Sequence, residues 1–137
     1  MQLKIQSIAE LPTAASELLH YCLNKRVFAF LGEMGTGKTA LISEICKLLG
    51  VTGPVSSPTY ALINEYESSP KIFHIDLYRL TTIEEVLDIG IEEYLAQNHY
   101  CFIEWPQLIQ PLLPPETVYV KMEAISENAR LMTIQIK

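Results

Sequence analysis

The amino-acid sequence predicts an α/β fold that ends in an antiparallel hairpin, and three observations carry this prediction. Residues 27–31 are continuously apolar and lead through a glycine-rich loop into residues with helical spacing, which is the order of a strand, a loop and a helix. Short strand-like runs alternate with helix-like stretches in the middle of the chain. Residues 117–125 and 131–136 alternate between polar and apolar side chains on both sides of a short polar turn, as the strands of a hairpin do.

The first elements frame the glycine-rich loop. Residues 3–8 alternate like a strand, and residues 12–23 carry apolar side chains at the spacing of a helix. Residues 27–31 predict a strand that is buried on both faces, because none of them is polar. Residues 32–37 form the loop, and apolar residues recur at helical spacing over 38–49 before a glycine ends the helix.

The middle of the chain predicts three more strands and one interrupted helix. Residues 60–66 and 71–75 are strand-like and flank the turn 67–70, so they form a hairpin or two neighbouring strands. Residues 82–95 begin with the capping-box pattern and are helical apart from a pause at one glycine. Residues 100–103 predict a short apolar strand, and a proline-rich connection then leads to the closing hairpin.

Length and charge restrict the function. The chain has 137 residues and no repeat or clear linker, so we expect a single domain over 1–137. Its 10 Lys and Arg residues against 16 Asp and Glu residues give a formal net charge of −6, and no basic run is long enough to neutralise a row of phosphates. Autonomous tight binding to DNA or RNA is therefore disfavoured, because phosphate neutralisation supplies most non-specific affinity. If nucleic acid is involved, we expect a partner to hold it.

The expected compartment follows from the lack of a signal-peptide core, the lack of a membrane-spanning apolar run and the pattern of the cysteines. Polar residues interrupt the apolar ones at the N-terminus, so no signal-peptide core is present, and no apolar run approaches the ~20 residues that span a bilayer. We therefore expect a cytoplasmic protein without a membrane segment. Cys22, Cys46 and Cys101 are odd in number, far apart and embedded in apolar segments, which predicts buried, reduced thiols rather than disulfides or a zinc site.

Residues 32–39 carry the motif that indicates the chemistry. They read Gly32-Glu33-Met34-Gly35-Thr36-Gly37-Lys38-Thr39, which is the P-loop pattern of a glycine, four residues and then Gly-Lys-Thr. Between a buried strand and a helix, such a loop directs backbone N–H groups inward at a helix end with partial positive charge, so it suits a polyphosphate. Lys38 can then reach the β and γ oxygens, and the Thr39 hydroxyl can ligate Mg²⁺. The alternative is a glycine-rich turn with a solvated lysine.

Two carboxylates end short predicted strands. Glu104 is the best candidate for holding the phosphate-bound Mg²⁺, with a surface glutamate that ends a strand as the alternative. Asp76 could orient or deprotonate the attacking water, or it could pair with Arg79 and stabilise a turn. His74 shares a strand face with Asp76, and we expect a structural imidazole there rather than a metal ligand, because no second His or Cys completes a site.

Further residues bear on which nucleotide is bound and how. Thr59 lies in Ser57-Pro58-Thr59-Tyr60, where other P-loop proteins place a threonine that senses the γ-phosphate, although a simple turn fits equally well. Trp105 could cover a base, contact a partner or plug the sheet edge. ATP is favoured over GTP because the chain has no Asn-Lys-x-Asp motif, and no lid rich in Arg or Lys is visible, as a small-molecule kinase would need.

The ordered motifs together resemble the TsaE family, the small bacterial ATPases of tRNA threonylcarbamoyladenosine (t6A) synthesis. The resemblance rests on the loop at 32–39 followed by Ser57-Pro58-Thr59-Tyr60, His74-Ile75-Asp76-Leu77-Tyr78-Arg79, Leu87-Asp88-Ile89-Gly90 and Ile103-Glu104-Trp105-Pro106, and it runs essentially end to end. It implies a three-layer α/β fold of the P-loop NTPase type with a mixed central sheet and the C-terminal antiparallel hairpin. It also implies ATP and Mg²⁺ as cofactors.

The resemblance further implies a place in a larger assembly. Members of the family act with a TsaB–TsaD complex that transfers threonylcarbamoyl to adenosine 37 of tRNAs reading codons that begin with A, and their ATP cycle is thought to reset this complex between turnovers. The acidic charge fits such a role, since TsaB and TsaD would grip the tRNA and this chain would contact it only indirectly. The family permits a monomer or weak self-association. A small-molecule kinase and a non-hydrolytic, nucleotide-gated binding module are the alternatives.

The family's residue roles carry over by motif. Asp76, Lys38 and Glu104 would form the catalytic group, with Asp76 needed for hydrolysis, and Thr39 and Glu104 would hold Mg²⁺. Tyr78 and Arg79 would line the nucleotide or partner edge. Met34 and Thr36 stand where the family more usually has Leu and Ala or Ser, and we expect both to serve side-chain packing. The nucleotide would be bound by Glu33, Met34, Gly35, Thr36, Gly37, Lys38, Thr39, Thr59 and Trp105.

Overall fold

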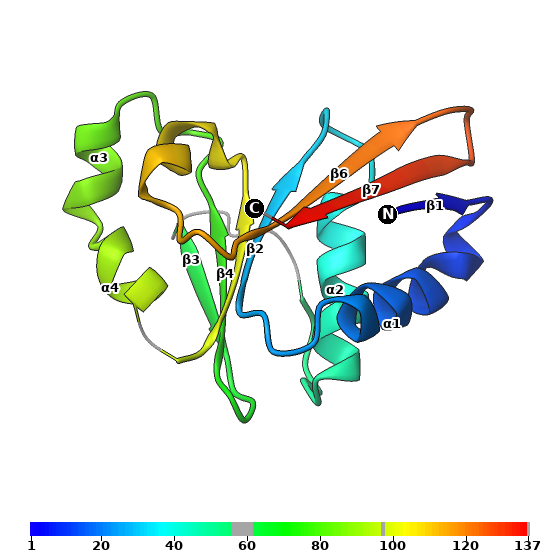
Figure 1. Ribbon diagram of the computed structural model, residues 1–137, viewed down its shortest axis with the longest axis horizontal. Coiled ribbons are helices and arrows are strands. Elements are labelled where there is room, and N and C mark those ends of the chain that lie inside the picture. Colours follow the sequence, from blue (N-terminus) through cyan, green and yellow to red (C-terminus); the bar gives the residue numbers. More distant parts are fainter. Residues whose placement is uncertain (56–61, 97, 137) are drawn as a thin grey trace.

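A mixed sheet of seven strands forms the centre of the described part of the chain, in the order β1-β7-β6-β2-β5-β4-β3 (Figure 1). The structure is a computed structural model that describes residues 1–55, 62–96 and 98–136. The strands are β1 (Gln2–Ile5), β2 (Val27–Leu31), β3 (Ile63–Tyr66), β4 (Ile72–Asp76), β5 (Tyr100–Glu104), β6 (Val118–Ala124) and β7 (Arg130–Ile136).

The middle of the sheet is parallel and its outer parts are antiparallel. β2 lies between β5 and β6 and is parallel to both, and β4 extends the parallel part beyond β5. The predicted C-terminal hairpin consists of β6 and β7, to which β1 adds antiparallel, while β3 pairs antiparallel with β4. Because β2, β4 and β5 run in one direction, their carboxyl ends meet at the same edge of the sheet, where open α/β folds bind ligands.

Helices cover both faces of the sheet (Figure 1). On one face, α1 (Leu11–Tyr21) and α2 (Lys38–Leu48) bury a core that includes Leu18, Leu41 and Phe28. On the other face, α3 (Ile83–Asp88), α4 (Ile91–Ala96) and the 3₁₀ helix η2 (Pro106–Leu112) bury Val86, Ile91 and Ile109 against β4 and β5. The expected three-layer fold with a mixed sheet and a closing hairpin is thereby confirmed. None of the helices in the described ranges has the length and apolar character needed to cross a membrane.

Local sequence explains where the helix after β4 begins. Thr82 caps α3, because its hydroxyl accepts a hydrogen bond from the backbone N–H of Glu85 at 3.3 Å. The carboxylate of Glu85 in turn accepts from the backbone N–H of Thr82 at 3.1 Å, which completes the predicted capping box. Gly90 then adopts a positive φ of 78° and separates α3 from α4, at the predicted pause.

The strand predicted over 3–8 is too long. β1 pairs with β7 only as far as Ile5, and residues 8–10 form the short 3₁₀ helix η1 (Ile8–Glu10). The backbone N–H of Gln6 donates to the Glu10 carboxylate at 2.7 Å, which turns the chain away from the sheet. The apolar residue that extended the alternation, Ile8, is 78% exposed. In the segment predicted as a strand over 60–66, β3 occupies Ile63–Tyr66, and residues 60 and 61 lie outside the described residues.

The prediction of buried, reduced thiols is confirmed. Cys22, Cys46 and Cys101 are all buried and none forms a disulfide. Burial raises the pKa of Cys46 and of Cys101 to about 12. Because the thiolate is the reactive form of cysteine, these thiols are unreactive near neutral pH and serve the core.

Candidate functional site

The carboxyl ends of β2, β4 and β5 bring the glycine-rich loop and two carboxylates around one cavity. Glu104 pairs with Phe30 near the end of β2, from which the loop starts, and Asp76 pairs with Glu104 one strand further along the sheet. The cavity has a volume of about 560 Å³. It is lined by Met34, Gly35, Gly37, Lys38, Thr39, Leu62, Asp76, Tyr78, Arg79, Glu104 and Trp105.

The backbone of the loop needs its glycines. Gly32, Gly35 and Gly37 have φ angles of +145°, +82° and +97°, which side chains with a Cβ rarely adopt. Gly32 is also sterically closed, because a Cβ there would lie 2.5 Å from the carbonyl oxygen of Met122 on β6. Gly37 is the N-cap residue of α2 and has no side chain to cap the first N–H groups of that helix. A helix N-terminus without a side-chain cap, directly after a glycine-rich loop, suits an anion.

Lys38 is held within the loop by two contacts. Its ammonium group donates to the carbonyl oxygen of Gly32 at 2.6 Å and lies 3.6 Å from the ring centroid of Trp105. The side chain is only 5% exposed, and burial lowers the pKa of the ammonium group, which the negative charge of Glu104 opposes. Trp105 itself has a positive φ of 57°, an uncommon conformation for a bulky residue. The unusual backbone therefore places an indole ring against the lysine at the cavity wall.

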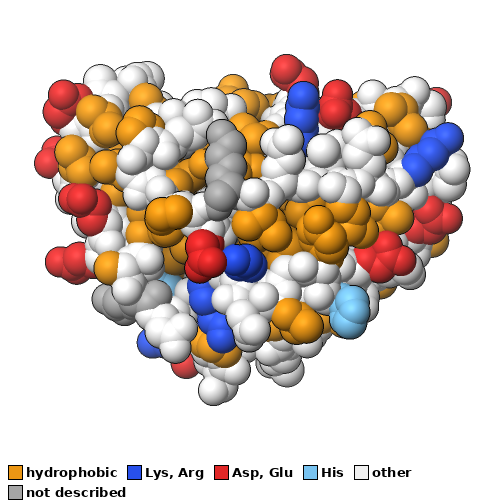
Figure 2. Space-filling view, in the orientation of Figure 1, with side chains coloured by type: hydrophobic (Ala, Val, Ile, Leu, Met, Phe, Trp, Pro, Cys, Tyr) orange, Lys and Arg blue, Asp and Glu red, His pale blue; other side chains and the backbone are white. Residues whose placement is uncertain are grey.

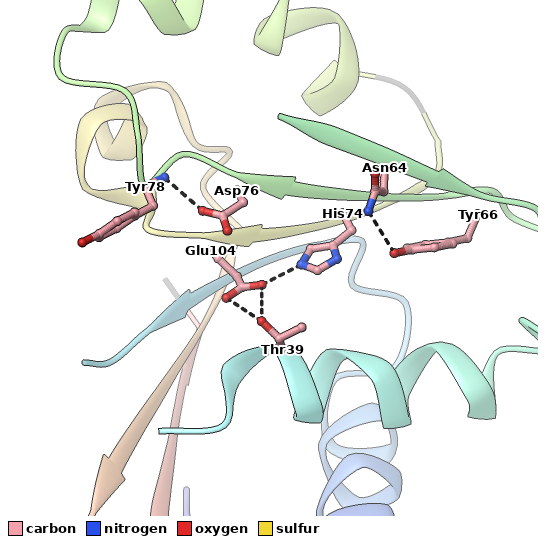
Figure 3. A network of polar contacts seen from close by, with 7 residues as sticks. All are labelled: Thr39, Asn64, Tyr66, His74, Asp76, Tyr78 and Glu104. Atoms are coloured by element: carbon pink, nitrogen blue, oxygen red, sulfur yellow. Dashed lines mark hydrogen bonds and ion pairs between the residues drawn. The ribbon is translucent and has the colours of Figure 1, made fainter. Parts of the chain in front are cut away.

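Glu104 is the centre of a polar network beneath the loop (Figure 3). The hydroxyl of Thr39 lies 2.9 and 3.1 Å from the two carboxylate oxygens, and Nε2 of His74 lies 2.7 Å from Oε2. His74 is fully buried and Glu104 nearly so. The structure therefore brings together the hydroxyl and the carboxylate that the sequence suggested as metal ligands. It also couples the imidazole to that carboxylate, as an oriented structural imidazole.

Asp76 lies on the same side of the cavity but in a different setting. Its Oδ1 accepts a hydrogen bond from the backbone N–H of Tyr78 at 3.0 Å (Figure 3). Burial raises the pKa of the Asp76 carboxyl above its ordinary value, and the hydrogen bond from Tyr78 opposes this rise. The ring of Tyr78 packs against Trp105 with the centroids 4.9 Å apart. Asp76 is thus a carboxylate with increased basicity that faces the cavity, beside an aromatic pair.

Arg130 is a site residue that the sequence did not indicate. From the start of β7, its guanidinium donates to the carbonyl oxygen of Thr36 at 3.2 Å and to that of Gly35 at 3.5 Å. The same group also binds three carbonyl oxygens around the β6–β7 turn, those of Ser126, Glu127 and Ala129. Arg130 therefore fastens the glycine-rich loop to the hairpin. No short-range signal could have found it, because 94 residues separate it from Thr36.

Four further residues were predicted to bind the nucleotide. Thr59 lies outside the described residues, so the expected switch-like loop has no structural description here. Thr36 is buried and its hydroxyl donates to the carbonyl oxygen of Glu33 at 2.8 Å, which agrees with a packing role. Met34 is 65% exposed, so the expectation that it serves packing is wrong. Met34 lines the cavity and is not part of the buried core. Glu33 and Thr36 do not line the cavity.

The donor set at Glu104 suits a hard divalent cation. Thr39 and Glu104 offer only oxygen atoms, which Mg²⁺ prefers. Within the described residues, no group of three or more His, Cys, Asp or Glu side chains could hold a metal ion. A cation bound here would therefore need further oxygen ligands from a phosphate and from water, as Mg²⁺ takes in nucleotide sites. The adjoining glycine-rich loop has the geometry to hold such a phosphate.

Comparison with known proteins gives the family. The family described as "Threonylcarbamoyl adenosine biosynthesis protein TsaE" matches residues 5–132. Proteins named "tRNA threonylcarbamoyladenosine biosynthesis protein TsaE" are similar: that of Rickettsia felis is 41% identical over 75% of this chain and 61% of its own length. That of Haemophilus influenzae is 38% identical over 80% of this chain and 70% of its own. The chain thus spans about three fifths of the length of the Rickettsia relative.

A solved structure agrees with the sequence comparison. The crystal structure of YdiB from Bacillus subtilis superposes with a TM-score of 0.79 at 25% identity, over 98% of this chain and 83% of that one. The Bacillus subtilis protein named TsaE is 32% identical over 78% of this chain and 67% of its own length. The family match extends over nearly all of the chain, and it includes the loop, both carboxylates, β6 and the start of β7. The chain belongs to the TsaE family.

Proposed function

We propose that this chain binds Mg²⁺-ATP, hydrolyses it slowly and serves tRNA t6A biosynthesis, where its ATP cycle resets a TsaB–TsaD complex between turnovers. One observation carries the proposal. A lysine, a hydroxyl and two carboxylates from three different elements, Lys38, Thr39, Asp76 and Glu104, converge on a single cavity beside an anion-binding loop. The names of the family and of its members supply the link to t6A biosynthesis.

Nucleotide binding follows from the loop. Backbone N–H groups at the start of α2 would hold the phosphates, and the Lys38 ammonium would leave the Gly32 carbonyl to meet their negative charge. Thr39 and Glu104 would hold Mg²⁺, since their oxygens already lie 2.9 to 3.1 Å apart. When bound, the cation would neutralise charge on the phosphate oxygens.

Hydrolysis follows from Asp76. Burial raises the pKa of the Asp76 carboxyl, so its carboxylate is a better base than that of an exposed aspartate. It lines the cavity with Lys38 and Glu104 but does not take part in the Thr39–Glu104 network. We assign it the role of orienting or deprotonating the attacking water. Lys38 would stabilise the charge that develops on the transferred phosphoryl group.

The charge of the chain supports an indirect contact with tRNA. The formal net charge is −6, and on the face shown in Figure 2 acidic side chains are widespread while the basic ones do not gather into a broad patch. A protein with this surface would gain little from phosphate neutralisation. TsaB and TsaD would hold the tRNA, and this chain, as a single cytoplasmic domain that is monomeric or weakly self-associating, would dock on their complex.

The test is Mg²⁺-dependent release of phosphate from ATP by the chain alone and with its cognate TsaB and TsaD proteins. We expect slow hydrolysis that the pair stimulates. Lys38→Ala should lose nucleotide affinity, Asp76→Ala should bind ATP but lose turnover, and Glu17→Ala, on the exposed face of α1, should match the unmodified chain.

Three outcomes would contradict parts of the proposal. Equal loss of ATP binding in Lys38→Ala and Asp76→Ala would refute the role of Asp76. Transfer of phosphate to an added metabolite, in place of release as free phosphate, would favour a small-molecule kinase. Full t6A synthesis by a variant that binds ATP but has no hydrolysis would favour a nucleotide-gated binding module.

A further inference from the structure

A buried histidine holds one oxygen of the proposed metal ligand. His74 is 0% exposed, and its Nε2 lies 2.7 Å from Oε2 of Glu104 (Figure 3). The sheet sets this pairing, because β4 and β5 are parallel and Glu104 lies opposite Asp76, two residues beyond His74 on the same face of β4. Burial confines both side chains, and the ring of Tyr66 lies near that of His74, with the centroids 6.4 Å apart.

The direction of this hydrogen bond defines the tautomer. As a metal ligand Glu104 is a carboxylate, which only accepts hydrogen bonds, so Nε2 of His74 must carry the hydrogen and donate. Nδ1 is buried and has no hydrogen-bond partner among the described residues. A buried polar atom without a partner costs stability, which a fully apolar side chain would avoid. His74 is therefore poorly explained as a core residue alone, and its defined contact is the one with Glu104.

The two oxygens of Glu104 are consequently not equivalent. Oε2 is engaged by His74 at 2.7 Å and by the Thr39 hydroxyl at 2.9 Å. Oε1 is engaged only by Thr39 within the described residues, at 3.1 Å. The Thr39 hydroxyl has a single hydrogen and can rotate it away when its oxygen ligates a cation. Oε1 is then free for the cation, while Oε2 stays bound to the buried imidazole.

We propose that His74 is a positioning residue that restricts Glu104 to a one-oxygen contact with the cation and so makes the site select Mg²⁺ over Ca²⁺. The inference rests on the proposed binding of a metal–nucleotide complex. Mg²⁺ has about six ligands in tight octahedral geometry and usually takes one oxygen from each carboxylate. Ca²⁺ accepts about six to eight ligands and commonly binds both oxygens of a carboxylate. A glutamate whose Oε2 already accepts a hydrogen bond from a buried imidazole offers Oε1 more readily than both oxygens together, which disfavours the larger ion.

The experiment compares the affinity of the full chain for ADP in Mg²⁺ and in Ca²⁺ by titration calorimetry. Three variants accompany the unmodified chain. His74→Leu removes the donor and keeps most of the volume, and His74→Gln keeps a donor near the position of Nε2. His99→Leu is the matched control, because His99 is also buried and also has an unpartnered ring nitrogen, but it packs against Phe73 on the other side of the sheet.

We expect the preference for Mg²⁺ over Ca²⁺, taken as the ratio of the two dissociation constants, to fall at least about fivefold in His74→Leu. His74→Gln should restore most of it, and His99→Leu should leave it unchanged even if its Tm falls. An unchanged ratio in His74→Leu, or an equal fall in His99→Leu, would overturn the role of His74. Failure of the unmodified chain to bind ADP with either cation would instead refute the proposed function.

A second readout needs neither metal nor nucleotide. Long-range proton–nitrogen NMR of the metal-free chain reports which ring nitrogen of His74 carries the hydrogen. We expect the Nε2–H tautomer, as the contact with Glu104 requires. An Nδ1–H tautomer would overturn the inference, and this result stands whether or not the His74→Leu variant folds.

Discussion

Replacing Gly32 with alanine should destabilise the protein much more than the same replacement at Gly35, although both glycines lie in one loop with positive φ. At Gly32 the new Cβ would lie 2.5 Å from the Met122 carbonyl oxygen and 2.9 Å from the Thr36 hydroxyl. The carbonyl belongs to β6, which pairs with β2, so it can retreat only if the sheet opens. At Gly35 no atom lies within 4 Å of the added Cβ, and only the backbone conformation is unfavourable.

The magnitude follows from these two contributions. A left-handed backbone costs a residue with a Cβ about 1–2 kcal/mol, which applies to both variants. Forcing a methyl group into occupied space costs about 1–3 kcal/mol more, which applies to Gly32→Ala alone. We therefore expect Gly32→Ala to lose about 2–5 kcal/mol and Gly35→Ala about 1–2 kcal/mol of unfolding free energy. For a chain of this size, that is a fall in Tm of roughly 7–17 °C against roughly 4–7 °C.

Urea unfolding followed by circular dichroism, with Tm from calorimetry, measures this difference without nucleotide. Equal losses at Gly32 and Gly35 would refute the reasoning, because they would mean that β6 does not close over the start of the loop. A larger loss at Gly35 would show that backbone conformation outweighs the contact with Met122.

Three further predictions concern single side chains. Asp76→Asn should abolish ATP hydrolysis yet raise Tm at pH 7, because a raised pKa means that folding disfavours the ionised carboxyl. This cost is present above the raised pKa and absent below about pH 4, where thermal unfolding should no longer distinguish the two proteins. Arg130→Met should weaken ADP binding about tenfold in calorimetry, because the Gly35 and Thr36 carbonyls lose their charged donor. Lys4→Met, which removes one charge from an exposed position of β1, should leave the affinity unchanged, and equal ADP affinities of the two variants would contradict the bracing role of Arg130. Thr82→Ala should lower the unfolding free energy by about 1 kcal/mol in urea, as loss of a helix cap does, and no change would mean that the capping box contributes nothing to α3.

The predictions from the sequence agree best with the structure where the conformation of a segment depends on residues close to it in the chain. The glycine-rich loop, the strand before it and the helix after it are continuous in sequence, and their residue types dictate each conformation. The capping box at Thr82 is equally local. The strand over 3–8 was overextended because alternation alone cannot tell which apolar residue meets the sheet, and Ile8 meets solvent.

The amino-acid sequence by itself determined the glycine-rich loop and the candidate carboxylates, because the conformational freedom of glycine and the charges of lysine and acid side chains belong to the residues in any fold. Only the tertiary structure decided which of these residues contact each other. His74 meets Glu104 across 30 residues, and Arg130 meets Thr36 across 94. Such contacts depend on the order and register of β4, β5 and β7 in the sheet. The register of paired strands is set by which face of each strand is buried in the core. A linear pattern carries no information about that order, because strands far apart in the chain become neighbours only when the core closes.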